Sequence, residues 1–140
     1  MNNNNPRRVY TRDEINHILQ SNPAAVENAI IALFKLQTAG ERQAAQSSNH
    51  NDVGFNMCDA RAGTRFARWL LGMNDRNQAI YAKKSLQPNN LGPRDRRNIE
   101  RLFSRYCNYG ETPIDRARRI AITHSRQLTD IANGLLEVPE

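Results

Sequence analysis

The amino-acid sequence predicts a small all-α protein, a bundle or orthogonal array of five or six helices. Three observations support this fold class. Apolar residues recur at three- and four-residue spacing in several segments, and patterns typical of helix starts precede most of these segments. No segment alternates apolar and polar residues over the length of a strand.

Length and composition predict one domain. The chain has 140 residues, 39% of them hydrophobic, which is enough for one modest core. We expect this domain to span residues 11–140. Residues 1–10 are expected to form a disordered tail, because the asparagine run at 2–5 has no apolar face to bury and a proline follows it.

Two helices are predicted in the first third of the chain. Thr11 and Glu14 have the spacing of a capping box, which would start a short helix that ends near residue 20. Asn22 and Pro23 are expected to be the N-cap and the first residue of a long second helix that runs past Gly40. The apolar stripe of this helix comprises Val26, Ile30, Leu33 and Phe34, with Gln37 on the same side.

Residues 47–56 interrupt the helical period and predict a structured loop. Gly54 is expected to adopt a backbone conformation that other residues resist, and Phe55 to anchor the loop in the core. Asn56 is expected to cap the next helix, with Asp59 three residues later. An alternative is that backbone N–H groups at this helix start bind a phosphate.

Four further helices are predicted after this loop. The first carries core residues Ala62, Phe66, Trp69 and Leu70, ends at Gly72 and is followed by a short helix over 79–86. Pro93 is expected to open the next, and Thr112 and Pro113 to start a last helix with apolar residues from Ile114 to Leu135. In the helix that Pro93 opens, the residues expected to face inward are Ile99, Leu102, Phe103 and Tyr106.

Positive charge is concentrated in the second half of the chain. Residues 61–126 hold 15 Lys/Arg and 5 Asp/Glu, whereas the remainder holds 5 and 9, so that +10 and −4 give the net charge of +6. Seventeen of the 20 basic residues are arginine, which suits bidentate contacts to phosphate or carboxylate. This distribution favours an anionic partner; an ordinary solvated basic surface is the alternative.

The arginines form three sets on the predicted helices. At the start of the last helix a cation opposes the helix dipole, so no local stabilisation explains the third set. We expect DNA or RNA to bind to these residues, through salt-dependent and mainly sequence-independent contacts. The sets are Arg61, Arg65 and Arg68; Arg94, Arg97, Arg101 and Arg105; and Arg116 and Arg119.

No residue pattern predicts catalysis, a metal site or a cofactor. His50, Asp52, Cys58 and His124 are the candidates for a nucleophile or metal site, but their spacing matches no known ligand motif. The chain has no phosphate-binding loop of the ATPase type. Cys58 and Cys107 are expected to be reduced thiols that pack as small hydrophobic residues.

The sequence predicts a cytoplasmic protein that does not enter a membrane. Its N-terminus has no apolar segment of the signal-peptide type. The longest nearly continuous apolar run, residues 29–34, is far too short to cross a bilayer.

One long pattern covers most of the chain after the first helix, and its residues are Gln37, Thr38, Asn51, Gly54, Phe55, Asn56, Asp59, Ala60, Ala67, Leu70, Gln127, Leu128, Ile131 and Ala132. This pattern resembles a small helical module of phage and plasmid proteins, which occurs alone or beside helicase, primase or recombination domains. The resemblance implies a nucleic-acid setting in a mobile element. The usual Lys/Arg-Tyr before the C-terminal Gln-Leu is replaced here by His124, Ser125 and Arg126.

These features lead to three hypotheses of different classes. The first is a phage or mobile-element accessory protein that binds nucleic acid without being an enzyme. The second is an interaction module that docks its arginines on an acidic host, phage, replication or defence protein. The third is an enzyme that uses His50, Asp52 or Cys58. No pattern in the sequence indicates an oligomeric state.

Overall fold

The computed structural model describes residues 8–47 and 53–140. In these residues it contains six α-helices, two 3-10 turns and no strand, which confirms the predicted all-α class. The elements are α1 (Arg12–Ser21), α2 (Pro23–Ser47), α3 (Ala60–Leu71), η1 (Pro88–Asn90), α4 (Pro93–Phe103), η2 (Ser104–Tyr106), α5 (Pro113–Thr123) and α6 (Ser125–Ala132).

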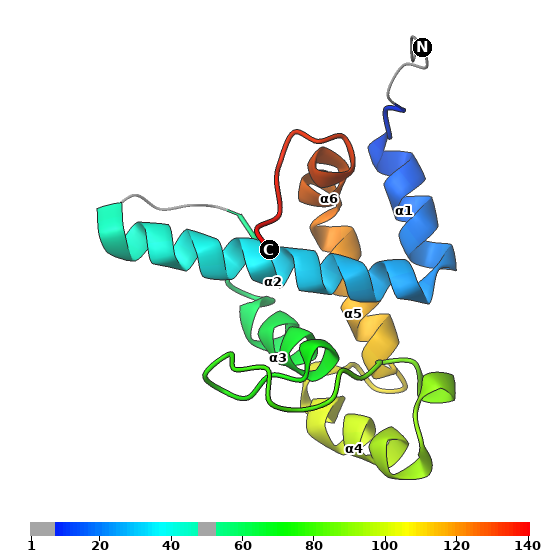
Figure 1. The fold of residues 1–140 in the computed structure, drawn as a ribbon. Helices are drawn as coiled ribbons and strands as arrows, with labels where there is room; N and C mark the ends of the chain where they lie inside the picture. Colours follow the sequence, from blue (N-terminus) through cyan, green and yellow to red (C-terminus); the bar gives the residue numbers. More distant parts are fainter. Residues whose placement is uncertain (1–7, 48–52) are drawn as a thin grey trace, which may run out of the picture.

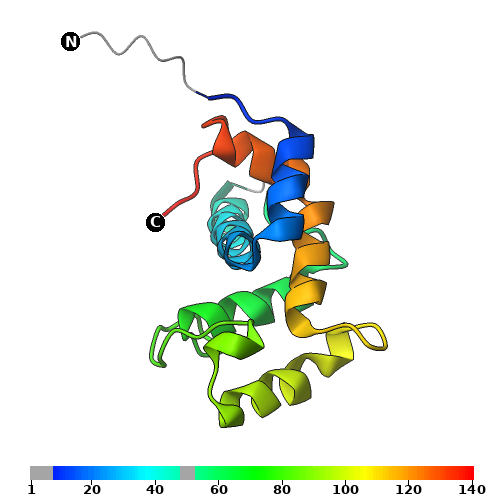
Figure 2. The ribbon, with the colours of Figure 1, turned by 90° about the vertical axis from the view of Figure 1, so that its right-hand side faces the viewer.

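Helix α2 is the longest element and runs across the molecule (Figure 1). It packs against α3 and α5, while α1 contacts α2, α5 and α6. Figure 2 shows α2 nearly end-on, with α1, α5 and α6 beside it and α3 and α4 in a lower layer. The fold is therefore an array of crossing helices around α2.

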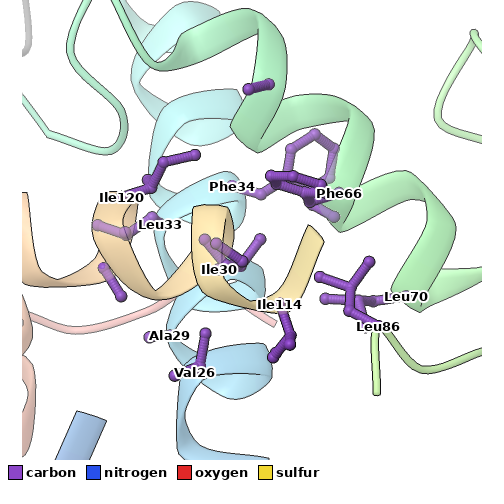
Figure 3. Close-up of a cluster of buried hydrophobic side chains, with 14 of the residues drawn as sticks. Val26, Ala29, Ile30, Leu33, Phe34, Phe66, Leu70, Leu86, Ile114 and Ile120 are labelled. Carbon is purple, nitrogen blue, oxygen red and sulfur yellow. The ribbon is translucent and has the colours of Figure 1, made fainter. Parts of the chain in front are cut away.

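The core forms where α2 meets α3 and α5, as Figure 3 shows. The predicted stripe of α2, from Val26 to Phe34, is buried as expected. Phe66 of α3 and Ile120 of α5 are fully buried against it. Deletion of side chains of this size and burial usually costs several kcal/mol, so this cluster fixes the relative positions of the three helices.

Helix starts follow the predicted caps. Thr11 and Glu14 form both hydrogen bonds of a capping box. The Asn22 carboxamide accepts from the Ala25 N–H at 3.2 Å, and the Thr112 hydroxyl accepts from the Asp115 N–H at 3.3 Å. Local residue chemistry therefore sets the starts of α1, α2 and α5.

The helix predicted over residues 79–86 is absent, and the prediction is wrong. The segment forms an irregular loop, with an isolated antiparallel bridge between Met73 and Ala79 and a positive φ of 60° at Asn77. Leu86 is the one apolar side chain of this segment that is fully buried. Without an apolar stripe to bury, a short helix here would gain little from packing.

The predicted last helix is two helices, because the chain turns at His124. This residue has φ −101° and ψ 21°, and its ring is buried. The turn separates α5 from α6, whose Leu128 still packs in the core. Leu135, expected to be buried in one long last helix, lies beyond the end of α6 at Ala132 and is 77% exposed.

Two smaller expectations also need correction. Leu102 of α4 is 42% exposed, although its position predicted an inward direction. Tyr10 belongs to the packed structure, because its N–H and carbonyl bond with the Asn133 side chain at 2.7 and 2.9 Å. The rest of the expected tail, residues 1–7, lies outside the described residues.

Candidate functional site

The loop before α3 is held by side chains from α6 and from the α5–α6 turn. Gln127 Oε1 accepts from the Gly54 N–H at 2.7 Å, and Gln127 Nε2 donates to the Gly54 carbonyl at 2.9 Å. His124 Nε2 accepts from the Asn56 N–H at 2.9 Å. Residues about 70 positions apart in sequence are thus joined by three hydrogen bonds to one loop.

Gly54 and Phe55 fit the positions that the sequence predicted. Gly54 has φ +87°, and a Cβ added there would lie 2.7 Å from Gln37 Cβ. Phe55 is buried in the core, and its ring occupies the space that a side chain at Gly63 would need. Both features confirm that the loop is anchored by close packing.

Asn56 caps a turn that leads into the helix. Its Oδ1 accepts from the Asp59 N–H at 2.8 Å, as the sequence predicted, while α3 itself begins at Ala60. The N–H groups of Gly54, Asn56 and Asp59 therefore all donate to side chains of the protein. This internal pairing, together with the Asp59 carboxylate at the helix start, argues against the alternative that the loop binds phosphate.

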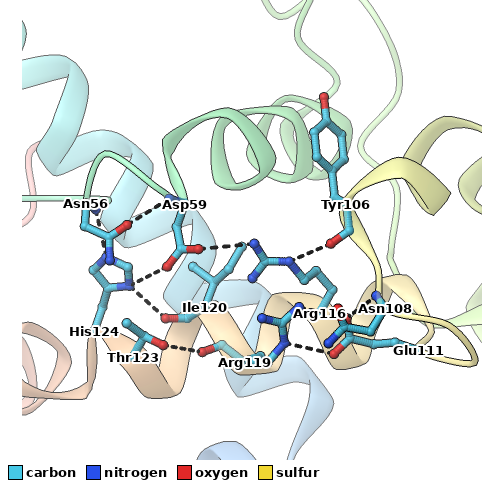
Figure 4. A network of polar contacts seen from close by, with 10 residues as sticks. All are labelled: Asn56, Asp59, Tyr106, Asn108, Glu111, Arg116, Arg119, Ile120, Thr123 and His124. Carbon is cyan, nitrogen blue, oxygen red and sulfur yellow. Dashed lines mark hydrogen bonds and ion pairs between the residues drawn. The ribbon is translucent and has the colours of Figure 1, made fainter.

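Behind the loop lies a network of charged groups, shown in Figure 4. Arg116 pairs with Asp59 at 3.2 Å, and its Nε–H donates to the Tyr106 carbonyl at 2.7 Å. Both side chains are about nine-tenths buried. The ring of His124 bonds with the Ile120 carbonyl at 2.8 Å, and its Nδ1 lies 4.0 Å from the Asp59 carboxylate.

Arg119 is held by Glu111 rather than left without a partner. Two hydrogen bonds, of 3.0 and 2.9 Å, join the guanidinium to the carboxylate. These bonds lower the pKa of Glu111 and raise the pKa of Arg119. Tertiary contacts therefore explain Arg116 and Arg119, for which the sequence alone offered no structural reason.

A second feature is a groove of about 280 Å³ beside α3, which we call the α3–α4 groove. Its walls come from α3, from α4 and from the loop that follows Gly72, which lies next to α3 in Figures 1 and 2. Three cations and one carboxylate line it, together with aromatic and aliphatic groups. The residues that line it include Arg65, Arg68, Trp69, Asp75, Tyr81, Lys84 and Leu102.

The loop wall of the groove is fixed by bonds to α3 and α2. Gly72 ends α3 with φ +70°, and its carbonyl accepts from the Tyr81 N–H at 2.8 Å. Arg68 Nε donates to Asn77 Oδ1 at 2.8 Å. Glu27 of α2 accepts from the Leu86 N–H at 2.6 Å and from the Ser85 hydroxyl at 2.7 Å. The groove is thus part of the folded structure.

The predicted arginine sets are separated. Arg65 and Arg68 line the groove, and Arg61 is exposed one turn earlier on the same helix. The second set, Arg94 to Arg105, is exposed along the side of α4 and η2 opposite the buried Ile99 and Phe103, and it does not line the groove. Two of the nine predicted arginines therefore contribute to it.

Sequence reasoning missed two groove residues, Tyr81 and Lys84. Both lie in the segment that was assigned to a helix, so their placement beside Arg65 was not foreseeable. Lys84 Nζ lies 4.4 Å from the centroid of the Trp69 ring and 3.4 Å from Asp95. The available signal in the sequence was a tyrosine two residues before the pair Lys83 and Lys84.

Of the four candidates for a nucleophile or metal site, Cys58 and His124 belong to the described residues. His50 and Asp52 lie outside them. Cys58 is exposed in the turn before α3, contrary to the expectation that it packs as a buried hydrophobic residue, while Cys107 is half-buried. Burial raises the pKa of the Cys107 thiol. Across residues 8–47 and 53–140, no three His, Cys, Asp or Glu residues are grouped as metal ligands.

Within that same part of the chain, no helix has the length and apolar content needed to span a membrane. No family model matches the sequence, and no curated protein or solved structure is significantly similar to it. Fold and site thus define a class only, a small all-α domain with a basic, aromatic-lined groove.

Proposed function

We propose that this protein is an accessory protein of a phage or another mobile element, and that it binds DNA or RNA without acting as an enzyme. The α3–α4 groove is the observation that carries this proposal. It combines three cations with one carboxylate, and it contains an exposed aromatic ring. The mobile-element setting rests on the resemblance of the sequence alone.

The charges of the groove suit a phosphate backbone. Among the described residues, Arg61, Arg65 and Arg68 form no ion pair, so their guanidinium groups are available to an anionic ligand. Arginine binds phosphate oxygens in a bidentate manner. The exposed arginines of α4 would add further phosphate contacts outside the groove, while Arg116 and Arg119 serve the fold.

Fluorescence anisotropy with labelled single- and double-stranded DNA and RNA, at low and moderate salt, tests the proposal. We expect binding that weakens as salt rises. The double variant Arg65→Ala/Arg68→Ala should reduce the slope of log K against log salt by about 0.7 for each lost contact to a single strand. Arg126→Ala, an exposed arginine of α6 outside the groove, is the matched control. Absence of salt-sensitive binding to all four ligands would overturn the proposal.

A further inference from the structure

The aromatic residues of the α3–α4 groove differ in what already contacts them. Trp69 is engaged within the protein, because its Nε1–H donates to the Ser85 carbonyl at 2.8 Å and the Lys84 ammonium lies over its ring. The Phe103 ring also meets it perpendicularly, at 5.9 Å between centroids. Trp69 therefore forms the fixed base of the groove.

Tyr81 is the aromatic side chain that remains accessible. It is 63% exposed, and among the described residues no other ring and no cation packs against it. Its backbone is held against the end of α3 through the bond to Gly72. An exposed aromatic residue on a fixed backbone loses little conformational freedom when a planar ligand stacks on it.

The cations lie on the α3 side of the same groove. Arg65 and Arg68 are three residues apart, and both line it together with Tyr81. The bond from Arg68 Nε to Asn77 fixes the direction of its guanidinium, whose terminal N–H groups have no other partner among the described residues. A strand whose base stacks on Tyr81 would thus have cationic groups within the same site for its phosphates.

Size separates the possible forms of nucleic acid. The volume of about 280 Å³ lies just below the range of roughly 300 to 1,000 Å³ found for small-molecule sites. A single base fits a site of this size, whereas a double helix does not enter it. In a duplex the faces of the bases are also covered by neighbouring base pairs, so Tyr81 could not stack on them.

We propose that the α3–α4 groove binds single-stranded nucleic acid by stacking an unpaired base on Tyr81, with Arg65 and Arg68 contacting the adjoining phosphates. This inference rests on the proposed function and makes it more specific. Sequence preference is expected to be weak, because every base has a face that can stack. The same groove geometry accepts DNA and RNA, so both are tested.

The test compares affinities for oligothymidylate, oligouridylate and a DNA duplex of the same length, measured by anisotropy at low salt. We expect tighter binding to the two single strands than to the duplex. Tyr81→Ala should weaken single-strand binding by roughly 5- to 150-fold, while Tyr81→Phe, which keeps the ring, should retain it. Tyr109→Ala removes a fully exposed tyrosine outside the groove and is the matched control.

The outcomes separate the two proposals. Equal binding to single strands and duplex, with Tyr81→Ala unchanged like Tyr109→Ala, would overturn the stacking inference and leave nucleic-acid binding intact. Preference for the duplex would overturn it as well. Failure to bind any of the three ligands would overturn the stacking inference, and failure to bind duplex RNA as well would also overturn the proposed function. Circular dichroism of Tyr81→Ala, whose side chain is largely exposed, should show wild-type helix content.

Discussion

Gln127 and Gly54 are joined by a pair of hydrogen bonds, of 2.7 and 2.9 Å, between the side-chain carboxamide and both backbone groups of the glycine. Through this pair α6 holds the loop that leads into α3. The loop in turn positions Phe55 in the core and Asn56 at the start of the turn before α3. Stability of the α3 region therefore depends on a residue 73 positions away.

Gln127→Ala is expected to lower the free energy of unfolding by about 2–3 kcal/mol, because two partly buried backbone groups lose their partners. Urea denaturation followed by circular dichroism measures this change. Gln20→Ala, an exposed glutamine of α1, should change stability by less than about 0.5 kcal/mol. If the two variants are equally stable, the loop does not depend on the two hydrogen bonds between Gln127 and Gly54.

Arg116→Ala is expected to destabilise the protein by about 3–5 kcal/mol, because it leaves the buried Asp59 carboxylate without its cation. Asp59→Asn in the same chain should recover part of this loss, and a double-mutant cycle measures the coupling. Arg97→Ala, on the exposed side of α4, is the control and should be nearly neutral. A small effect of Arg116→Ala would contradict a structural role for this arginine.

Stability should fall in acid partly through Glu111. Hydrogen bonds from Arg119 hold the pKa of this carboxyl below its ordinary value of about 4.3, so the unfolded state binds its proton more readily. The contribution is present above pH 4.3 and is lost as the pH falls through the lowered native pKa. It should not exceed about 1 kcal/mol, because the pair is partly exposed. Thermal unfolding measured from pH 7 to pH 3 should therefore show that the melting temperatures of Glu111→Gln and the wild type converge in acid. A difference in melting temperature that stays constant over this pH range would exclude the linkage.

Gly72→Ala tests the connection between helix end and groove. Its φ of +70° is unfavourable for alanine, and the added Cβ would overlap the Tyr81 carbonyl. We expect a loss of at least ~2 kcal/mol and weaker oligonucleotide binding, since the wall that carries Tyr81 must move. Gly92→Ala is a matched control, because nothing lies within 4 Å of a Cβ at that position. The melting temperature and the oligonucleotide affinity, the latter by anisotropy, are measured for both variants. Equal values for Gly72→Ala and Gly92→Ala would refute the proposed role of Gly72.

The sequence was informative where one local signal determined the structure. The apolar stripe from Val26 to Phe34 predicted the central helix, and Thr11 and Thr112 predicted helix starts that the structure contains. The roles of Gly54 and Phe55 were predicted correctly. A glycine in a loop commonly supplies a positive φ, and an aromatic residue there commonly anchors the loop in the core.

The groove depends on tertiary contacts that have no local pattern. Residues 79–86 do not form the predicted helix, because their backbone bonds with Gly72 at the end of α3 and with Glu27 of α2. No pattern within the segment itself indicates these two partners. Within its own helix, Arg116 is unfavourable because a cation at a helix start opposes the helix dipole. The tertiary fold places Asp59 beside it, which compensates for this effect. Spacing within one helix identifies charged stripes, but it does not reveal which arginines meet partners from another helix.

Emission from Trp69, the only tryptophan of the chain, tests the central claim most directly, because this residue forms the base of the α3–α4 groove. We predict that titration with oligothymidylate at low salt changes its fluorescence to saturation, with the affinity found by anisotropy. Added salt should reverse the change, and Arg65→Ala/Arg68→Ala should weaken it. Binding detected by anisotropy with unchanged Trp69 emission would contradict the account, since the nucleic acid would then be bound elsewhere on the protein.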